Sequence, residues 1–274
     1  MLEDLCSEIT RLKRNYMTNF TPVNYVTEII PYQRTRELGI EQSFLDKLNL
    51  FAQNNPIYFN QIDIMIDGIP CKSYEGDINS YWLSSKKYDT SYQPFYPTWV
   101  LSAFALAFIS KKLGYTELID VGSGDGRIAY CAAILGLRSI SMEIDTNLSV
   151  LQHNVISTTG VEFEILNVDA TDFYYSSLDL SSPVFFISGL PEQGDILARD
   201  VITKTRDQYE TRVKLGFNFM GTHMMRKYET DCHSWGWGDI IKSYGLNIIG
   251  CVTLPTFWTN DQELDTAYVF AQMA

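Results

Sequence analysis

From about residue 97 to the end of the chain, apolar residues follow helical and strand spacings in turn, with short polar loops between them. Helical spacing covers residues 97–113, 127–135, 145–157, 192–211 and 238–244. Strand-like runs cover residues 117–121, 138–143, 161–166, 183–188, 213–221, 247–254 and 266–273. The run at 183–188 is apolar throughout, so we expect it near the middle of a sheet.

This alternation predicts an α/β fold with a doubly wound, mostly parallel sheet of seven strands. Strands 247–254 and 266–273 are joined by a loop short enough for a hairpin, so the last two strands are expected to be antiparallel. A plain dinucleotide-binding fold has no reason to end in such a pair.

The first ninety-odd residues have a different pattern. Residues 1–17 place Leu5, Ile9 and Leu12 on one stripe, which predicts an amphipathic helix, and residues 41–52 predict a second. Residues 60–66 alternate like a strand and end at a turn sequence, Asp-Gly. We therefore divide the chain into a smaller N-terminal domain or lid, mainly helical or mixed, at residues 1–93, and a larger domain at residues 94–274.

The net charge of the chain indicates which classes of molecule it could bind. The chain has 21 basic and 33 acidic residues, a formal net charge of −12, and such a surface repels phosphates on average. The balance disfavours a nucleic acid and favours a small molecule or a basic protein. Aromatic residues are abundant, with 17 Tyr and 15 Phe, and several gather at 74–99 without a clear period. That segment fits either plain packing or a lid that stacks on a ligand.

The five cysteines are scattered and none belongs to a C-x-x-C pair, which indicates a reducing compartment. His223, Cys232 and His233 lie close in sequence, but no second pair completes a set of four ligands, so no metal is expected. The acidic start lacks the pattern of a signal peptide, and the longest apolar run, 99–109, is too short to span a bilayer. These features predict a cytoplasmic protein without membrane contact.

The clearest chemical signal is Leu118-Ile-Asp-Val-Gly-Ser-Gly-Asp-Gly-Arg127, an apolar strand that runs through alternating glycines into a helix. Alternating glycines let the backbone turn sharply and let a ligand approach without a Cβ in the way. The helix start presents free N–H groups, which suit a carboxylate or another anion. Ligands of open α/β sheets bind at this edge of the sheet.

Asp120 distinguishes between two ligand classes. The dinucleotide fingerprint is G-x-G-x-x-G, whereas this chain has G-x-G-x-G preceded by a carboxylate. A pyrophosphate is repelled by an adjacent carboxylate, but the ammonium of a methionine moiety is attracted to it. The pattern therefore favours S-adenosylmethionine over NAD.

Two further carboxylates end the following strands. Glu143 closes the second strand, at the distance expected for an acid that accepts both ribose hydroxyls. Asp169 follows the third strand and could accept the exocyclic amine of adenine, with Asp172 as the alternative for that role.

Together these residues resemble the class I, seven-strand S-adenosylmethionine-dependent methyltransferases, over roughly residue 94 to the C-terminus. The closer likeness is to archaeal protein-lysine methyltransferases and the non-SET histone-lysine methyltransferases. Matching stretches are Phe95-Tyr-Pro-Thr-Trp99, Asp120 to Arg127, and Ser141-Met-Glu-Ile-Asp145.

The resemblance implies a Rossmann-like methyltransferase fold. It also implies that Thr98 and its preceding loop help to cover the cofactor, and that Asp125 lies near the methionine end. The predicted cofactor-binding residues are Thr98, Asp120, Gly122, Ser123, Gly124, Asp125, Gly126, Glu143, Ile144, Asp169 and Ala170.

The segment after the fourth strand departs from the usual pattern. Many amine methyltransferases carry an Asn followed by an aromatic there, whereas this chain has Ile187-Ser-Gly-Leu-Pro-Glu192. Ser188 and Tyr96 are the predicted catalytic residues, and Glu192 is a further candidate for the acceptor pocket.

Three functions stay open at this point. The acceptor could be a protein lysine, as the resemblance implies, or a small metabolite, as the altered segment suggests. A catalytically silent protein that binds S-adenosylmethionine is the third. An NAD-dependent oxidoreductase would need the other glycine spacing and a helix-linked sixth strand, and the sequence has neither.

Overall fold

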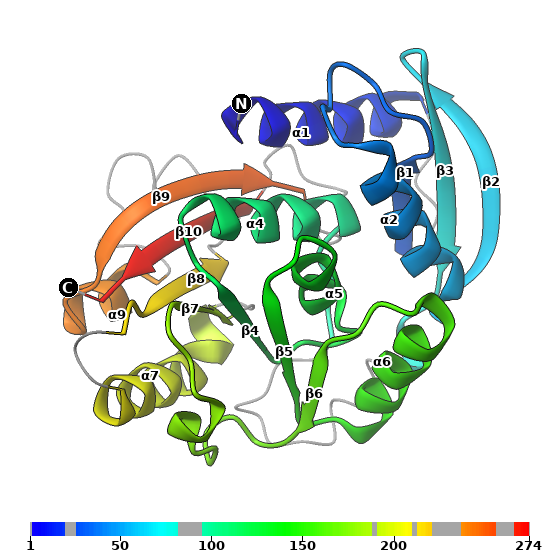
Figure 1. Ribbon diagram of the computed structural model, residues 1–274. Helices are drawn as coiled ribbons and strands as arrows, with labels where there is room; N and C mark the ends of the chain where they lie inside the picture. The colour runs from blue at the N-terminus through cyan, green and yellow to red at the C-terminus, as the bar shows by residue number, and fades with distance from the viewer. Residues whose placement is uncertain are drawn as a thin grey trace.

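The computed structural model describes residues 2–19, 26–81, 95–187, 191–209, 213–220, 237–255 and 266–273. A seven-stranded sheet forms the centre of the molecule, with the strand order β6-β5-β4-β7-β8-β10-β9 (Figure 1). Its strands are β4 (Glu117–Val121), β5 (Arg138–Glu143), β6 (Glu164–Asn167), β7 (Pro183–Ile187), β8 (Gly216–Met220), β9 (Asn247–Leu254) and β10 (Thr266–Gln272).

The predicted sheet is confirmed in its number of strands, in their directions and in the central place of the strand at 183–188. β4 pairs in parallel with β5 and β7, and β7 pairs in parallel with β8. β10 runs antiparallel to both β8 and β9, so the chain ends in the expected hairpin. β7, the run that is apolar throughout, lies fourth of the seven strands. Because both of its faces are buried, its five residues carry no polar alternation.

Helices cover both faces of this sheet (Figure 1). They are α4 (Val100–Lys112), α5 (Arg127–Ile134), α6 (Thr146–Thr159), α7 (Pro191–Gln208) and α9 (Gly238–Ser243), with a short 3₁₀ turn at Tyr175–Leu178. Alternate residues of β7 enter two separate hydrophobic clusters: Val184 and Phe186 face α4 and α5, whereas Phe185 and Ile187 face α7 and α9. The sheet is therefore doubly wound, as predicted.

The N-terminal part combines the two predicted helices, α1 (Leu2–Asn19) and α2 (Gln42–Asn54), with a three-stranded antiparallel sheet. Its strands β1 (Val26–Pro31), β2 (Tyr58–Ile66) and β3 (Ile69–Gly76) lie in the order β1-β3-β2. Asp67 and Gly68 form the predicted turn between β2 and β3 with φ of +48° and +78°. This part is thus mixed, because β1 and β3 join the one strand that periodicity predicted.

The core continues across the predicted boundary at residue 93. Phe51 of α2 packs on Tyr130 of α5 with ring centroids 4.9 Å apart, and Phe44 packs on Phe104 of α4 at 5.5 Å. One hydrophobic cluster includes Ile9 of α1 and Phe270 of β10. The N-terminal part therefore shares a hydrophobic core with the larger sheet and its helices. The division into two domains stays a prediction.

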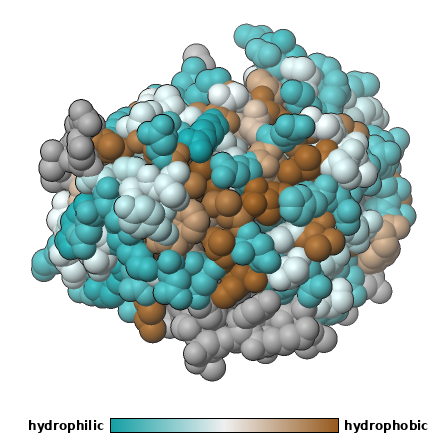
Figure 2. Space-filling view, turned by 60° about the horizontal axis from the view of Figure 1, so that its bottom comes forward, coloured by the Kyte–Doolittle hydropathy of each residue, from teal (hydrophilic) through white to brown (hydrophobic). Residues whose placement is uncertain are grey.

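The surface mixes polar and apolar residues. Hydrophobic residues gather across the middle of the face drawn in Figure 2, between hydrophilic ones. Of the described residues, the large hydrophobic side chains that are most exposed are Phe59, Ile62, Met65, Tyr96, Val150, Tyr174, Ile196 and Ile249. The first three lie on β2. No helix within the described ranges has the length and apolar character needed to cross a bilayer.

Candidate functional site

The glycine-rich turn between β4 and α5 has the backbone that its sequence predicts. Gly122, Gly124 and Gly126 have φ of +71°, +59° and +76°, a region that side chains with a Cβ rarely adopt. A Cβ on Gly124 would lie 2.5 Å from the ring of Phe95, and one on Gly126 would lie 3.0 Å from Gln152. A Cβ on Gly122 would meet no atom of the described residues within 4 Å. Of these three glycines, the first is therefore the one that the described residues leave uncovered, at the carboxyl end of β4.

Hydrogen bonds among three buried polar side chains, Ser123, Ser141 and Gln152, support this turn. The Ser123 hydroxyl lies 2.6 Å from the Ser141 hydroxyl of β5. Gln152 of α6 donates to the Ser123 hydroxyl at 2.9 Å and to the Gly124 carbonyl at 2.7 Å. Ser123, a predicted cofactor residue, is therefore a support for the backbone of the turn. Buried and satisfied networks of this kind keep a backbone rigid.

Asp120 is a buried carboxyl group whose two oxygens are largely unsatisfied by the described part of the chain. Its side chain is 1% exposed, and neither oxygen accepts a hydrogen bond of normal geometry from the described part of the chain. Burial, together with the nearby charges of Glu143 and Asp125, raises the pKa of Asp120 to about 8, although the Ala129 N–H opposes this shift in part. A buried anion without a partner is costly, so this position fits a cationic or N–H-donating group of a ligand.

Glu143 lies next to the turn. It is 6% exposed and accepts hydrogen bonds from Gly124 N at 2.7 Å and from Asp145 N at 2.9 Å. Burial raises the pKa of Glu143, and although these backbone donors oppose the shift, the pKa is still raised to about 7. Two carboxylate oxygens offer about four acceptor positions, so Glu143 keeps capacity for two hydroxyl groups. Its neighbour Ile144 is half-buried.

The next strand end carries Asp169 and Ala170. Asp169 is partly buried, and its Oδ1 accepts from the backbone and hydroxyl of Thr171 at 2.8 and 2.7 Å. Asp172, the alternative for the adenine contact, is exposed. The Val168 N–H donates to the Glu143 carbonyl at 3.1 Å, which ties this segment to the end of β5. Because Asp169 is partly buried and Asp172 is exposed, Asp169 is favoured for the predicted adenine contact.

Asp125 takes part in a buried charge network that the sequence did not predict. Its carboxylate accepts from Arg127 Nε and Nη2 at 2.8 and 2.6 Å, and from Asn55 Nδ2 at 2.8 Å. Arg127 also donates to Glu28 of β1 at 2.6 Å and to the Tyr58 hydroxyl of β2 at 3.1 Å. Asp125 is thus bound by the N-terminal part, and its predicted place near the methionine end stays a prediction.

Glu28, Asn55 and Tyr58 lie far from the glycine-rich turn in sequence, so no local pattern joins them to it. The one available signal was Glu28 itself, a charged residue within a run that is otherwise apolar except for Thr27. It is 0% exposed, and burial raises its pKa to about 7 even though the charge of Arg127 opposes the shift. An acid in such a place usually pairs with a buried base.

The remaining predicted residues are placed as follows. The Thr98 hydroxyl lies 2.8 Å from the Tyr268 hydroxyl of β10, and the Thr98 carbonyl accepts from Arg127. Tyr96 is 48% exposed. Ser188 and the side chain of Glu192 lie outside the described residues, as do His223, Cys232 and His233. The cofactor role of Thr98 and the catalytic roles of Ser188 and Tyr96 therefore stay predictions.

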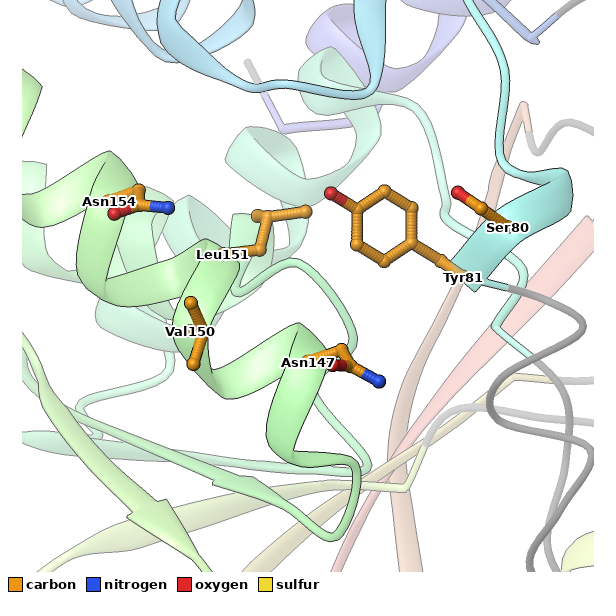
Figure 3. A pocket seen from close by; sticks show the side chains of 6 residues that line it. All are labelled: Ser80, Tyr81, Asn147, Val150, Leu151 and Asn154. Atoms are coloured by element: carbon orange, nitrogen blue, oxygen red, sulfur yellow. The ribbon is translucent and has the colours of Figure 1, made fainter.

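A cavity of about 420 Å³ lies between α6 and the segment after β3 (Figure 3). Asn147, Val150, Leu151 and Asn154 line it from α6, and the ring of Tyr81 points toward Leu151 from the segment after β3 (Figure 3). Burial raises the pKa of Tyr81, and the charge of Asp125 adds to this effect. Tyr81, in the aromatic segment 74–99, thus lies near Asp125 of the glycine-rich turn. Plain packing and a lid over a ligand were the two predictions for this segment.

Comparisons with known proteins find similarity of fold. No protein-family model and no curated protein sequence matches this chain. Among solved structures, a candidate RNA methyltransferase from Pyrococcus horikoshii has 14% identity and a TM-score of 0.46, over 71% of this chain and 96% of the other.

Two further solved structures are similar. The glycopeptide N-methyltransferase MtfA, complexed with S-adenosylmethionine, has 10% identity and a TM-score of 0.44, over 63% of this chain and 94% of the other. A ribosomal protein L11 methylase from Lactobacillus delbrueckii subsp. bulgaricus has 14% identity and a TM-score of 0.41, over 62% and 78%. Similarity this distant carries no argument about chemistry, which depends on the site itself.

Proposed function

We propose that this protein is an S-adenosylmethionine-dependent methyltransferase whose cofactor binds at the glycine-rich turn. One observation carries the proposal: Asp120 is fully buried at the end of β4, neither of its oxygens accepts a hydrogen bond of normal geometry from the described chain, and no described atom lies within 4 Å of where a Cβ on Gly122 would be. An ammonium group at this place would supply the missing charge and hydrogen bonds. The residues of the site therefore fit the methionine end of this cofactor.

Each strand end has a role in this proposal. Asp120 accepts hydrogen bonds from the cofactor's ammonium, Glu143 from its ribose hydroxyls, and Asp169 from its adenine amine. Gly122 leaves room for the ligand, while Gly124 and Gly126 let the turn pack on Phe95 and Gln152. Ile144 and Ala170 lie beside two of these carboxylates and would contact the adenosine through apolar atoms.

When bound, the cofactor would supply an electrophilic methyl group: the acceptor attacks the methyl carbon in line with the C–S bond, and the sulfur leaves as the neutral thioether S-adenosylhomocysteine. The protein aligns the acceptor and excludes water, and alignment can lower the barrier by several kcal/mol. An amine acceptor must lose its proton before attack, and Tyr96 and Ser188 are the proposed groups beside it. No strongly basic catalytic residue is required for this reaction.

The same charges argue against a dinucleotide. Asp120, Glu143 and Asp125 are three buried carboxyl groups whose charges act on one another. A pyrophosphate placed on this turn would either hold Asp120 and Glu143 in their protonated forms or meet them as like charges, and it would supply no N–H donor to their oxygens. An NAD-dependent oxidoreductase is therefore disfavoured on electrostatic grounds.

We propose a protein lysine as the acceptor. The motif likeness to protein-lysine methyltransferases and the net charge of −12 support it, because an acidic surface attracts a basic protein. The segment Ile187 to Glu192 supports the alternatives, a small-molecule methyltransferase or a silent binder, since it lacks the Asn and the aromatic residue.

Methyl transfer from labelled S-adenosylmethionine distinguishes these acceptors. The purified full chain is incubated with a histone mixture and, separately, with small primary amines, and Asp120→Asn is the control. We expect label on lysine side chains, lost in the variant and reduced by salt. Label on the small amines alone would favour a small-molecule enzyme, and binding without any transfer would favour the silent protein.

A further inference from the structure

Asn55 is a buried polar residue that directly follows α2 in the N-terminal part. Its side chain is 1% exposed. Asn55 Oδ1 accepts from the Ile57 N–H at 3.1 Å, and Asn55 Nδ2 donates to Asp125 Oδ2 at 2.8 Å. A backbone N–H can only donate and a carboxylate can only accept, so these two partners determine the orientation of the amide. Asn55 therefore joins the end of α2 to the glycine-rich turn through a hydrogen bond between buried groups.

The hydrogen bond from Asn55 reaches Asp125 from outside the turn. Two other donors to this carboxylate, Arg127 Nε at 2.8 Å and Nη2 at 2.6 Å, belong to a residue only two positions further along the chain. Asn55 is 70 positions away. Glu28 of the N-terminal part acts on Asp125 only through Arg127, to which it is bonded at 2.6 Å. Asn55 therefore contacts Asp125 directly, and a hydrogen bond to a charged group is among the stronger ones.

The position of Asp125 affects a group that we propose binds the cofactor. Asp125 lies between Gly124 and Gly126, which have φ of +59° and +76°. Glycine backbones have the greatest conformational freedom, so the side chain between them anchors this part of the turn. The Gly124 N–H donates to Glu143 Oε2 at 2.7 Å. A displacement of Asp125 would therefore also move Gly124 and the N–H that holds the Glu143 carboxylate.

We propose that Asn55 is a positioning residue for the cofactor. Its amide holds Asp125, and thereby the Gly124 N–H and the Glu143 carboxylate, in the arrangement that binds the ribose. The inference rests on the proposed function, in which Glu143 accepts from the ribose hydroxyls. An Asn55 that only ends α2 would support stability, but it would leave the cofactor affinity of the folded chain unchanged.

Asn55→Asp removes the donor to Asp125 with almost no change of shape. The new side chain keeps an acceptor for the Ile57 N–H, but it sets a second carboxylate against Asp125, and like charges in close contact repel. We expect the dissociation constant of S-adenosylmethionine to rise by about tenfold, as for the loss of one hydrogen bond to a charged group. Asn55→Ala removes the donor without adding a charge and should raise it by about fivefold. The alanine variant gives the test if Asn55→Asp does not fold.

Asn49→Asp is the matched control, because Asn49 is a second buried asparagine of α2. Its Nδ2 donates to the carbonyls of Leu45 and Pro31 at 2.9 Å each, and its Oδ1 accepts from the Tyr74 hydroxyl at 2.9 Å. These partners belong to α2, β1 and β3 rather than to the turn. Both aspartate variants should lower the melting temperature, but only Asn55→Asp should weaken binding. Calorimetric titration of the full chain, at a temperature where circular dichroism shows each variant folded, measures the affinities.

Amide hydrogen exchange tests the positioning in the absence of the cofactor. In the ligand-free chain, the Gly124 N–H should exchange about tenfold faster in Asn55→Asp than in the wild type, as measured by NMR, and Asn49→Asp should leave it unchanged. Unchanged affinity and exchange in a folded Asn55 variant, or equal effects of Asn55→Asp and Asn49→Asp, would overturn the inference. A wild-type chain that does not bind S-adenosylmethionine would contradict the proposed function itself, and the exchange of Gly124 would then decide whether Asn55 positions the turn.

Discussion

Arg127 at the start of α5 and Glu28 in β1 form a buried ion pair, with Arg127 Nη1 2.6 Å from Glu28 Oε1. Their side chains are 3% and 0% exposed. The pair joins the N-terminal part to the helix that follows the glycine-rich turn, and Arg127 binds Asp125 of that turn as well. Elements on both sides of the predicted domain boundary at residue 93 therefore fix the backbone of the glycine-rich turn, where we propose that the cofactor binds.

Removing Arg127 should lower the free energy of unfolding of the protein. Arg127→Leu leaves Glu28 and Asp125 as buried carboxylates without their base, a change that costs about 3–5 kcal/mol. Arg199→Leu is the matched control, because Arg199 is 37% exposed and its partner Asp239 is 78% exposed. We expect the control to change the free energy of unfolding by less than about 1 kcal/mol. Urea denaturation measures both, and equal losses would contradict the buried network.

The second glycine of the turn is required for packing. Gly124→Ala combines a φ of +59° with a Cβ 2.5 Å from Phe95, so we expect a loss of about 2 kcal/mol or more. Gly250→Ala is the control, since its Cβ would meet nothing within 4 Å. Adding Phe95→Ala to Gly124→Ala should recover only part of the loss, because the backbone strain persists. Full recovery in the double variant would show that φ is unimportant.

The stability of the ligand-free protein should depend on Asp120 and pH. The pKa of Asp120 is raised to about 8, against about 4 in the unfolded chain, so the folded state holds a proton that the unfolded state releases. This contribution is complete below pH 4 and is lost as the pH rises toward 8, by about 1.4 kcal/mol per pH unit.

Asp120→Asn removes that titration. The difference in unfolding free energy between the variant and the wild type should therefore increase in favour of the variant from pH 5 to pH 8. Denaturation across this range measures it, and a difference that does not change with pH would contradict the buried state of Asp120.

Asp169 and Asp172 offer a paired test of the adenine contact. Asp169→Asn keeps an acceptor for Thr171 but removes the charge, so we expect cofactor affinity to fall by about fivefold, the loss of one charged hydrogen bond. Asp172→Asn, at an exposed position, should leave affinity unchanged. Calorimetric titration measures both, and the reverse order would assign the contact to Asp172.

The sequence predicted the larger sheet well because its strands are short apolar runs between clear turn signals. β4, β5 and β9 have the predicted bounds, whereas β6 begins at Glu164 rather than at 161. It could also be predicted that Asp120 and Glu143 lie at the same edge of the sheet, since neighbouring parallel strands have their carboxyl ends at one edge.

β1 and β3 were not predicted, for local reasons. β1 is buried along nearly all its length and shows no alternation, and β3 contains Pro70 and Gly76. The ion pair of Glu28 with Arg127 was out of reach because its partners are 99 residues apart and meet only through the packing of β1 on α4 and α5. Local patterns predict elements, but they do not predict buried contacts between distant ones.

The central claim is tested most directly by calorimetric titration of S-adenosylmethionine into the wild-type chain and into Asp120→Asn, with NAD as the comparison ligand. We predict that S-adenosylmethionine binds the wild-type chain at micromolar affinity, that Asp120→Asn weakens this binding at least tenfold, and that NAD does not bind. Binding of NAD, or equal affinity of both chains for S-adenosylmethionine, would contradict the proposed role of the buried Asp120 carboxylate.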